Sequence, residues 1–117
     1  MLSLSSDYHS KMISLILTTV ASQQQADALA EPLVRSALAA CVTQLPKAKS
    51  CYFWDGKFET SEEILLLIKA PATKVNALKA WLETHHPYDC PEMLVFEAVD
   101  GLEAYMKWVM QQTSQTP

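Results

Sequence analysis

Glycine is scarce in this chain of 117 residues, which contains only Gly56 and Gly101. The dinucleotide fingerprint and the phosphate-cradling loop both need several glycines at fixed offsets, so both motifs are excluded. Basic residues are also few, nine against 13 acidic ones, and the formal net charge is -4. Because nucleic-acid phosphates are bound through clustered lysine and arginine, this composition argues against a nucleic-acid partner.

The three cysteines are odd in number and show no C-x-x-C spacing. They indicate neither a disulfide framework nor a structural zinc centre, and we therefore expect a cytoplasmic protein. Residues 1–11 are polar, rich in serine and without the apolar run of a signal peptide, so we expect a flexible leader there. Residues 12–117 are predicted to form one domain with no membrane partner, because 50% hydrophobic content suits a compact core but not a membrane span.

A long antiparallel hairpin is the strongest local prediction. Its expected strands are Cys41–Leu45, then Cys51–Trp54 after a break at Pro46, and finally Ile64–Lys69. Branched and aromatic residues favour extended backbone, and the Asp55-Gly56 pair supplies the positive φ angles of a two-residue turn. Both faces of these runs are apolar, so both faces of the hairpin are predicted to need burial.

Three segments have the apolar spacing of helices. The first opens with a capping box at Ser22 and Gln25 and contains Pro32, where we expect a local kink. The second is predicted to begin near Thr73 as its cap and to stop by His85, because a proline at position 87 restricts the residue before it.

The third helix is predicted to follow a second capping box, formed by Asp100 and Glu103. Two further runs, Ile13–Val20 and Met93–Val99, are rich in branched residues and read as strands. The resulting order predicts a ferredoxin-like α+β sandwich, an antiparallel sheet with its helices on one face. The other sheet face then needs a partner subunit to cover it.

In several ordered motifs the chain resembles the CutA family, the divalent-cation tolerance proteins. The matching motifs are Leu38-Ala39-Ala40-Cys41-Val42, Pro46, Tyr52-x-Trp54-x-Gly56-Lys57, Ile68-Lys69, His86-Pro87-Tyr88-x-x-Pro91-Glu92 and Tyr105-x-x-Trp108. They extend from Met12 to about Gln111, essentially the whole domain. The resemblance implies a stable ferredoxin-like homotrimer whose long hairpins pair between neighbours. It also implies a role linked to copper and other divalent cations, with no established catalytic activity.

Three positions depart from the family pattern. Ala37 stands where lysine is common, and Lys47 stands where glycine follows the proline. Thr18 occupies the place of a cysteine proposed as a copper ligand in some members. The loss of that thiol argues against a high-affinity copper site in this chain.

The resemblance also suggests an inter-subunit cleft. Its candidate residues are Cys41, Lys69, Tyr88, Glu92 and Trp54. Each has a simpler explanation, because Cys41 can serve as a small buried hydrophobe, and Trp54 and Tyr88 can be packing aromatics. Lys69 and Glu92 can also be an ordinary ion pair.

His85, His86 and Cys90 are the candidate metal ligands, since copper(II) and zinc favour imidazole and thiolate. Adjacent histidines in an extended chain point apart, so one ion cannot easily use both. The alternative is that the histidines simply interact with the terminal carbonyl groups of a helix. We expect at most weak, pH-sensitive copper binding that depends on His86.

Two other functions are compatible with the sequence. The chain could be a trimeric small-molecule sensor resembling the PII signalling proteins, with ligand clefts between subunits. It could also be an enzyme with Cys41 or Cys90 as nucleophile and His85 or His86 as base. No local catalytic motif supports an enzyme, and we expect the protein to have no catalytic activity.

Overall fold

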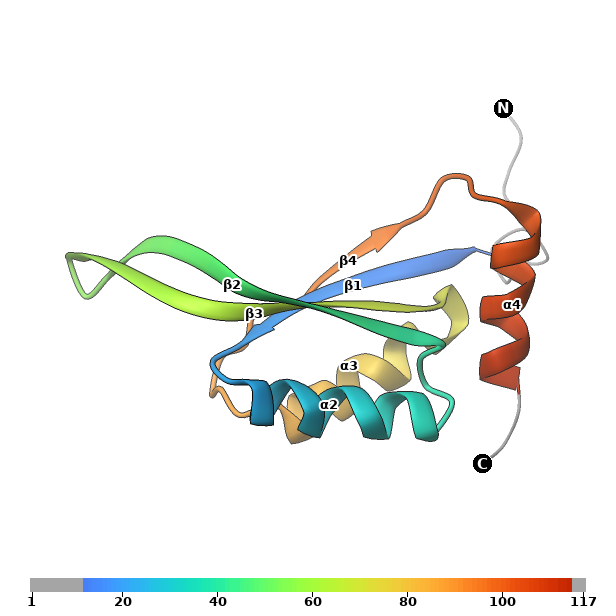
Figure 1. Cartoon of the computed structure of the whole chain (residues 1–117), viewed down its shortest axis with the longest axis horizontal. Coiled ribbons are helices and arrows are strands. Elements are labelled where there is room, and N and C mark those ends of the chain that lie inside the picture. The colour runs from blue at the N-terminus through green and yellow to red at the C-terminus, as the bar shows by residue number, and fades with distance from the viewer. Residues whose placement is uncertain (1–11, 115–117) are drawn as a thin grey trace.

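The computed structural model describes residues 12–114, which form a four-stranded sheet with three α-helices. The elements are β1 (Ile13–Val20), α2 (Gln23–Arg35), β2 (Cys41–Trp54), β3 (Lys57–Pro71), a 3₁₀ turn (Ala72–Lys74), α3 (Val75–His85), β4 (Leu94–Glu97) and α4 (Glu103–Ser114). The sheet order is β2-β3-β1-β4 and every pairing is antiparallel (Figure 1). This arrangement confirms the predicted ferredoxin-like α+β fold. The expected leader, residues 1–11, lies outside the described residues.

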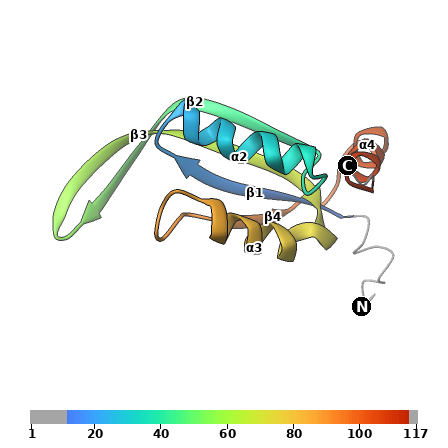
Figure 2. The same ribbon diagram turned by 90° about the horizontal axis from the view of Figure 1, so that it is seen from below.

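Helices α2 and α3 cover one face of the sheet, as predicted (Figures 1 and 2). The core between them and the sheet contains Ile16, Val20, Leu29, Leu33, Ile64, Leu66, Ile68, Leu78 and Leu82. Helix α4 does not join this layer but stands at one end of the sheet (Figure 1). It buries Val109 against Ile13 and Ala40, a second and smaller core. Since Ile13 and Ile16 lie an odd number of residues apart in one strand, they point to opposite faces, and α4 therefore packs beyond the reach of the main core.

The β2–β3 hairpin is longer than the sequence indicated and extends well past the body of the molecule (Figure 1). Asp55 and Gly56 have φ angles of 53° and 78°, which confirms the predicted turn. The expected break at Pro46 is wrong, because β2 continues through it with a register shift between Leu45 and Ala48. A bulge accommodates a residue without an N–H and bends the strand without ending it.

The starts of α2 and α3 differ in how closely they follow the local sequence signals. Ser22 Oγ accepts a hydrogen bond of 3.2 Å from the Gln25 N–H, as predicted, while Gln25 Oε1 accepts one of 2.9 Å from the Ala21 N–H. The prediction that Thr73 caps the second helix is wrong, because Thr73 lies inside the 3₁₀ turn that precedes α3.

The capping box predicted for the third helix, formed by Asp100 and Glu103, is also wrong. Asp100 Oδ1 accepts from the adjacent Gly101 N–H at 2.8 Å, and Glu103 is the first residue of α4. The first bond of that helix joins the Met106 N–H to the Leu102 carbonyl at 3.0 Å. Helix α2 continues through Pro32 to Arg35, and the expected kink stays a prediction.

Candidate functional site

His86 lies at the centre of a buried polar network between β1 and the segment after α3. Its backbone is extended (φ -66°, ψ 138°), as expected before a proline, and its side chain is 7% exposed. The Tyr88 N–H donates to His86 Nδ1 at 3.1 Å, so the neutral ring carries its proton on Nε2. Nε2 lies 3.0 Å from the Thr19 carbonyl oxygen and 3.1 Å from Thr18 Oγ1. Both ring nitrogens are therefore engaged within the protein.

Thr18 completes this network. It is fully buried, and its hydroxyl donates to the Glu92 carbonyl oxygen at 2.6 Å while a lone pair faces His86. Burial lowers the pKa of His86, and the hydrogen bond to the Thr19 carbonyl opposes this effect in part. The imidazole is thus held neutral inside the fold, in a structural position that the sequence pattern did not reveal.

The three predicted metal ligands are not gathered into one site within the chain. His85 is exposed, stacks on Trp81 at a centroid distance of 4.1 Å, and has Nδ1 2.8 Å from the Trp81 carbonyl oxygen. Cys90 is an exposed free thiol. Residues 12–114 contain no group of three histidine, cysteine or acidic side chains placed to hold one ion. The ligands within residues 12–114 of one copy therefore do not fit a dedicated metal centre, since structural and catalytic sites need at least three.

Tyr88, a predicted cleft residue, lies beside this network on its outer side. Its ring contacts that of His86 at 4.9 Å, and its hydroxyl donates to Glu63 Oε2 at 3.2 Å. Burial, together with the Glu63 carboxylate, raises the pKa of Tyr88 to about 12. The phenol thus stays protonated and links the loop after α3 to strand β3.

Cys41 and Lys69 are brought together on the face of the sheet that α2 and α3 do not cover. They are cross-strand partners of β2 and β3, with Lys69 Nζ 3.8 Å from Cys41 Sγ. The ammonium group also donates to Thr43 Oγ1. Thr43 follows Cys41 by two residues and so shares its face, and the two-residue period of a strand is the sequence signal that identifies it.

The other two predicted cleft residues lie elsewhere in the chain. Trp54 is at the tip of the hairpin and is 71% exposed. Glu92 is exposed and contributes its carbonyl group to Thr18. Among the described residues the ion pairs are Arg35–Glu31 and Lys107–Glu103, so Lys69 and Glu92 do not pair within one copy.

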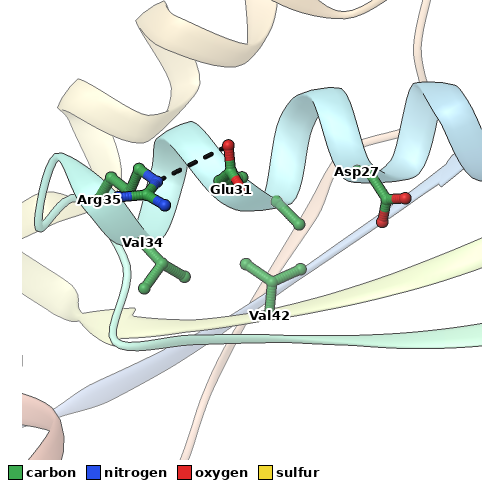
Figure 3. A pocket seen from close by; sticks show the side chains of 6 residues that line it. Asp27, Glu31, Val34, Arg35 and Val42 are labelled. Carbon is green, nitrogen blue, oxygen red and sulfur yellow. Dashed lines mark ion pairs between the residues drawn. The ribbon is translucent and has the colours of Figure 1, made fainter.

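A shallow groove runs between α2 and the edge strand β2, with Val34 and Val42 facing one another across it (Figure 3). Its charged residues already have partners. Arg35 Nε lies 3.7 Å from Glu31 Oε2, and Asp27 Oδ1 accepts from Gln44 Nε2 at 3.0 Å. The groove therefore presents one solvent-exposed ion pair and one carboxylate that is held by a neutral amide.

Fold and site together define a class of protein. It is a ferredoxin-like α+β domain with an extended hairpin. Within residues 12–114 no cysteine is hydrogen-bonded to a histidine, which is the contact that the alternative of a cysteine nucleophile with a histidine base would need. The sequence comparisons give the family. The family model described as CutA1 divalent ion tolerance protein matches residues 14–112, and the chain belongs to this family.

Named relatives and solved structures agree with this assignment. The divalent-cation tolerance protein CutA of Pectobacterium atrosepticum is 42% identical over 95 residues, which are 81% of this chain and 86% of that protein. CutA from Xylella fastidiosa is 42% identical with a TM-score of 0.83, over 86% of this chain and 97% of its own. CutA from Synechococcus elongatus is 35% identical with a TM-score of 0.85, over 88% and 91%.

Proposed function

We propose that the chain is a non-catalytic homotrimer that contributes to divalent-cation tolerance. The observation that carries this proposal is the presence of two exposed apolar surfaces on different parts of one copy. The hairpin surface wraps both faces of the hairpin end, with Phe53 and Phe58 on one face and Tyr52 and Trp54 on the other, and these side chains are 42% to 74% exposed. The β4–α4 surface consists of Leu94, Phe96, Val99, Leu102, Tyr105 and Trp108, which are 41% to 87% exposed.

Such surfaces are typical of subunit contacts, because large exposed apolar patches are rare on monomers. The two surfaces differ in shape and composition, so the simplest contact places the hairpin surface of one copy on the β4–α4 surface of the next. Contacts between unlike surfaces close into rings when the rotation allows it. The number three follows from the resemblance to the CutA family.

Light scattering after size-exclusion chromatography tests this assembly. Phe53, 74% exposed at the hairpin, should tolerate Asp in an isolated fold but not in an apolar interface. We expect the wild-type protein to elute as a trimer, and we expect the Phe53→Asp variant not to assemble into a trimer. Asn76→Asp places the same charge on an exposed position of α3 and should remain trimeric. A folded, monomeric wild type at micromolar concentration would contradict the proposal.

Cation binding is proposed to be weak and to use exposed groups. His86 has no free ring nitrogen, so His85 and Cys90 are the available ligands, and an assembly must bring several copies together to complete a site. Calorimetric titration with copper(II) should show that His85→Gln removes binding, while His86→Gln leaves the affinity unchanged. Tight binding by the His85→Gln variant would show that the ligands lie elsewhere.

The cytoplasm is the compartment that we propose. Cys41, Cys51 and Cys90 are all free thiols, two of them exposed, which suits a reducing environment. CutA from Archaeoglobus fulgidus is described as a periplasmic protein, so the compartment needs its own test. Fractionation of the source cells should place the protein with cytoplasmic markers, and release with the periplasmic fraction would contradict this.

A further inference from the structure

His85 and His86 are neighbours in the chain, and their neutral rings carry the proton on opposite nitrogens. The Tyr88 N–H donates to Nδ1 of His86, so the His86 ring is protonated on Nε2. In His85 it is Nδ1 that lies 2.8 Å from the Trp81 carbonyl oxygen. A carbonyl oxygen only accepts hydrogen bonds, so Nδ1 of His85 carries the proton and Nε2 keeps its lone pair. His85 therefore offers one free ligand atom to solvent, whereas His86 offers none.

The His85 ring is held in one orientation by Trp81. The two side chains are one helical turn apart on α3, and their rings stack at a centroid distance of 4.1 Å with 14° between the planes. Trp81 is half-buried and packs against the main core, so the surface under the imidazole is fixed. A ring N–H that donates to a backbone carbonyl is also the usual outer contact of a metal-binding histidine. Nε2 of His85 is thus both free and pre-oriented.

The free lone pair determines which cations His85 can bind. Imidazole nitrogen suits zinc(II), copper(II) and nickel(II), whereas calcium and magnesium prefer oxygen ligands. One ligand does not hold a bare zinc ion, and residues 12–114 contain no group of three histidine, cysteine or acidic side chains to complete its coordination. A bare ion therefore needs ligands from several copies. An ion that already carries a small chelator has only its remaining open position to fill, and one imidazole can fill it.

We propose that His85 binds zinc(II) or copper(II) in chelated form, as a cation that arrives with a small chelating molecule already attached. Nε2 donates its lone pair to the metal, and one metal-bound water leaves. No proton is released, because Nε2 of the neutral ring carries none. This binding mode rests on the cation-linked role proposed above, and it adds the class of ligand and the atom that binds it. His85 belongs to neither of the two surfaces proposed for subunit contact, so every copy in the assembly carries its own site.

Nitrogen-15 NMR of the histidine rings in the intact protein tests this mode, with zinc(II)–iminodiacetate as the probe. Iminodiacetate leaves part of the coordination sphere of zinc open, whereas EDTA closes it. Before zinc is added, the spectra should show the neutral His85 ring protonated on Nδ1 and the His86 ring protonated on Nε2. The probe should then shift the Nε2 resonance of His85 in a saturable way, at one complex per chain, and leave His86 unchanged. Zinc(II)–EDTA should shift neither ring.

Two variants locate the binding atom. His85→Gln should abolish the saturable response to zinc(II)–iminodiacetate, because no imidazole remains at the end of α3 to bind the ion. Thr84→Gln changes the preceding exposed residue of the same helix and should retain the response. His86 serves as an internal control in the wild-type spectrum, so the test does not depend on the folding of a His86 variant.

The outcomes distinguish chelated binding from the cation role on which it rests. A neutral His85 ring protonated on Nε2, an equal response to zinc(II)–EDTA, or a full response in His85→Gln would overturn chelated binding at His85. If bare zinc(II) shifts His85 but zinc(II)–iminodiacetate does not, chelated binding is wrong and the cation role stands. If neither form of zinc binds, and copper(II) does not bind in the calorimetric titration described above, both proposals are contradicted.

Discussion

Thr18 and His86 are 68 residues apart in the sequence and are joined by a buried hydrogen bond of 3.1 Å between Oγ1 and Nε2. The threonine hydroxyl also donates to the Glu92 carbonyl, so one side chain ties β1 to both ends of the segment that leads from α3 to β4. Within the described residues no buried side-chain nitrogen or oxygen lacks a partner. The network is complete only while the imidazole is neutral, since its Nδ1 accepts a hydrogen bond.

Acid should destabilise the protein through His86. Its pKa is lowered in the folded state, whereas in the unfolded chain it has the ordinary value of 6.5. Its contribution is complete above pH 6.5 and is lost as the pH falls from there through the lower folded pKa, because the unfolded chain takes up its proton first. We expect the denaturant concentration at the unfolding midpoint to decrease as the pH is lowered from about 7 to about 5.

His86→Gln should flatten this part of the pH profile, since no imidazole remains to be protonated in the network. His85→Gln is the matched control, because His85 is exposed, and it should leave the pH dependence in place. An equal flattening by both variants would show that the buried network is not the origin of the effect.

Thr18→Val should destabilise the fold although it preserves shape. The substitution leaves the Glu92 carbonyl without its donor and removes one partner of His86. The expected loss is about 1 to 3 kcal/mol, as for other unsatisfied buried groups. Thr84→Val removes an exposed hydroxyl bonded to the Ala80 carbonyl of its own helix and should cost far less in the same urea titration. Comparable losses would argue that hydroxyl removal has no special cost at position 18.

Pro32→Ala should be neutral or stabilise the protein by up to about 2.6 kcal/mol. Alanine restores a backbone N–H that can bond the Ala28 carbonyl, a gain of about 3 kcal/mol in a helix interior. The greater freedom of the unfolded chain opposes this by about 0.4 to 1 kcal/mol. Pro32 is exposed, so its removal opens no cavity. A clear fall in the thermal midpoint would instead mean that a bend at Pro32 is needed for packing.

Gly56→Ala should cost about 1 to 2 kcal/mol through strain alone. Gly56 has φ of 78°, and a Cβ at this position would meet nothing within 4 Å, so steric contact is not involved. Gly101→Ala is the complementary case, because its added Cβ would meet only the flexible Met106 side chain, with Sδ at 3.2 Å. Thermal denaturation should rank Gly56→Ala as the more damaging substitution, and the reverse order would contradict the role of the turn.

Local chemistry in the sequence determined the elements of this fold. The Asp55-Gly56 pair requires positive φ angles, Ser22 and Gln25 cap a helix, and a proline after His86 ends another, and each of these effects acts within a few residues. The family motifs are also ordered along the chain, so the resemblance to CutA proteins could be read directly from the sequence.

The site depended on contacts between distant residues, which only the tertiary structure decided. The sequence analysis expected copper binding to depend on His86, but β1 lies against His86 and leaves the adjacent His85 in solvent. The bulge at Pro46 and the pairing of Cys41 with Lys69 likewise follow from strand register, which is set by long-range burial. Local pattern fixes which faces are apolar, and packing decides which polar groups meet across them.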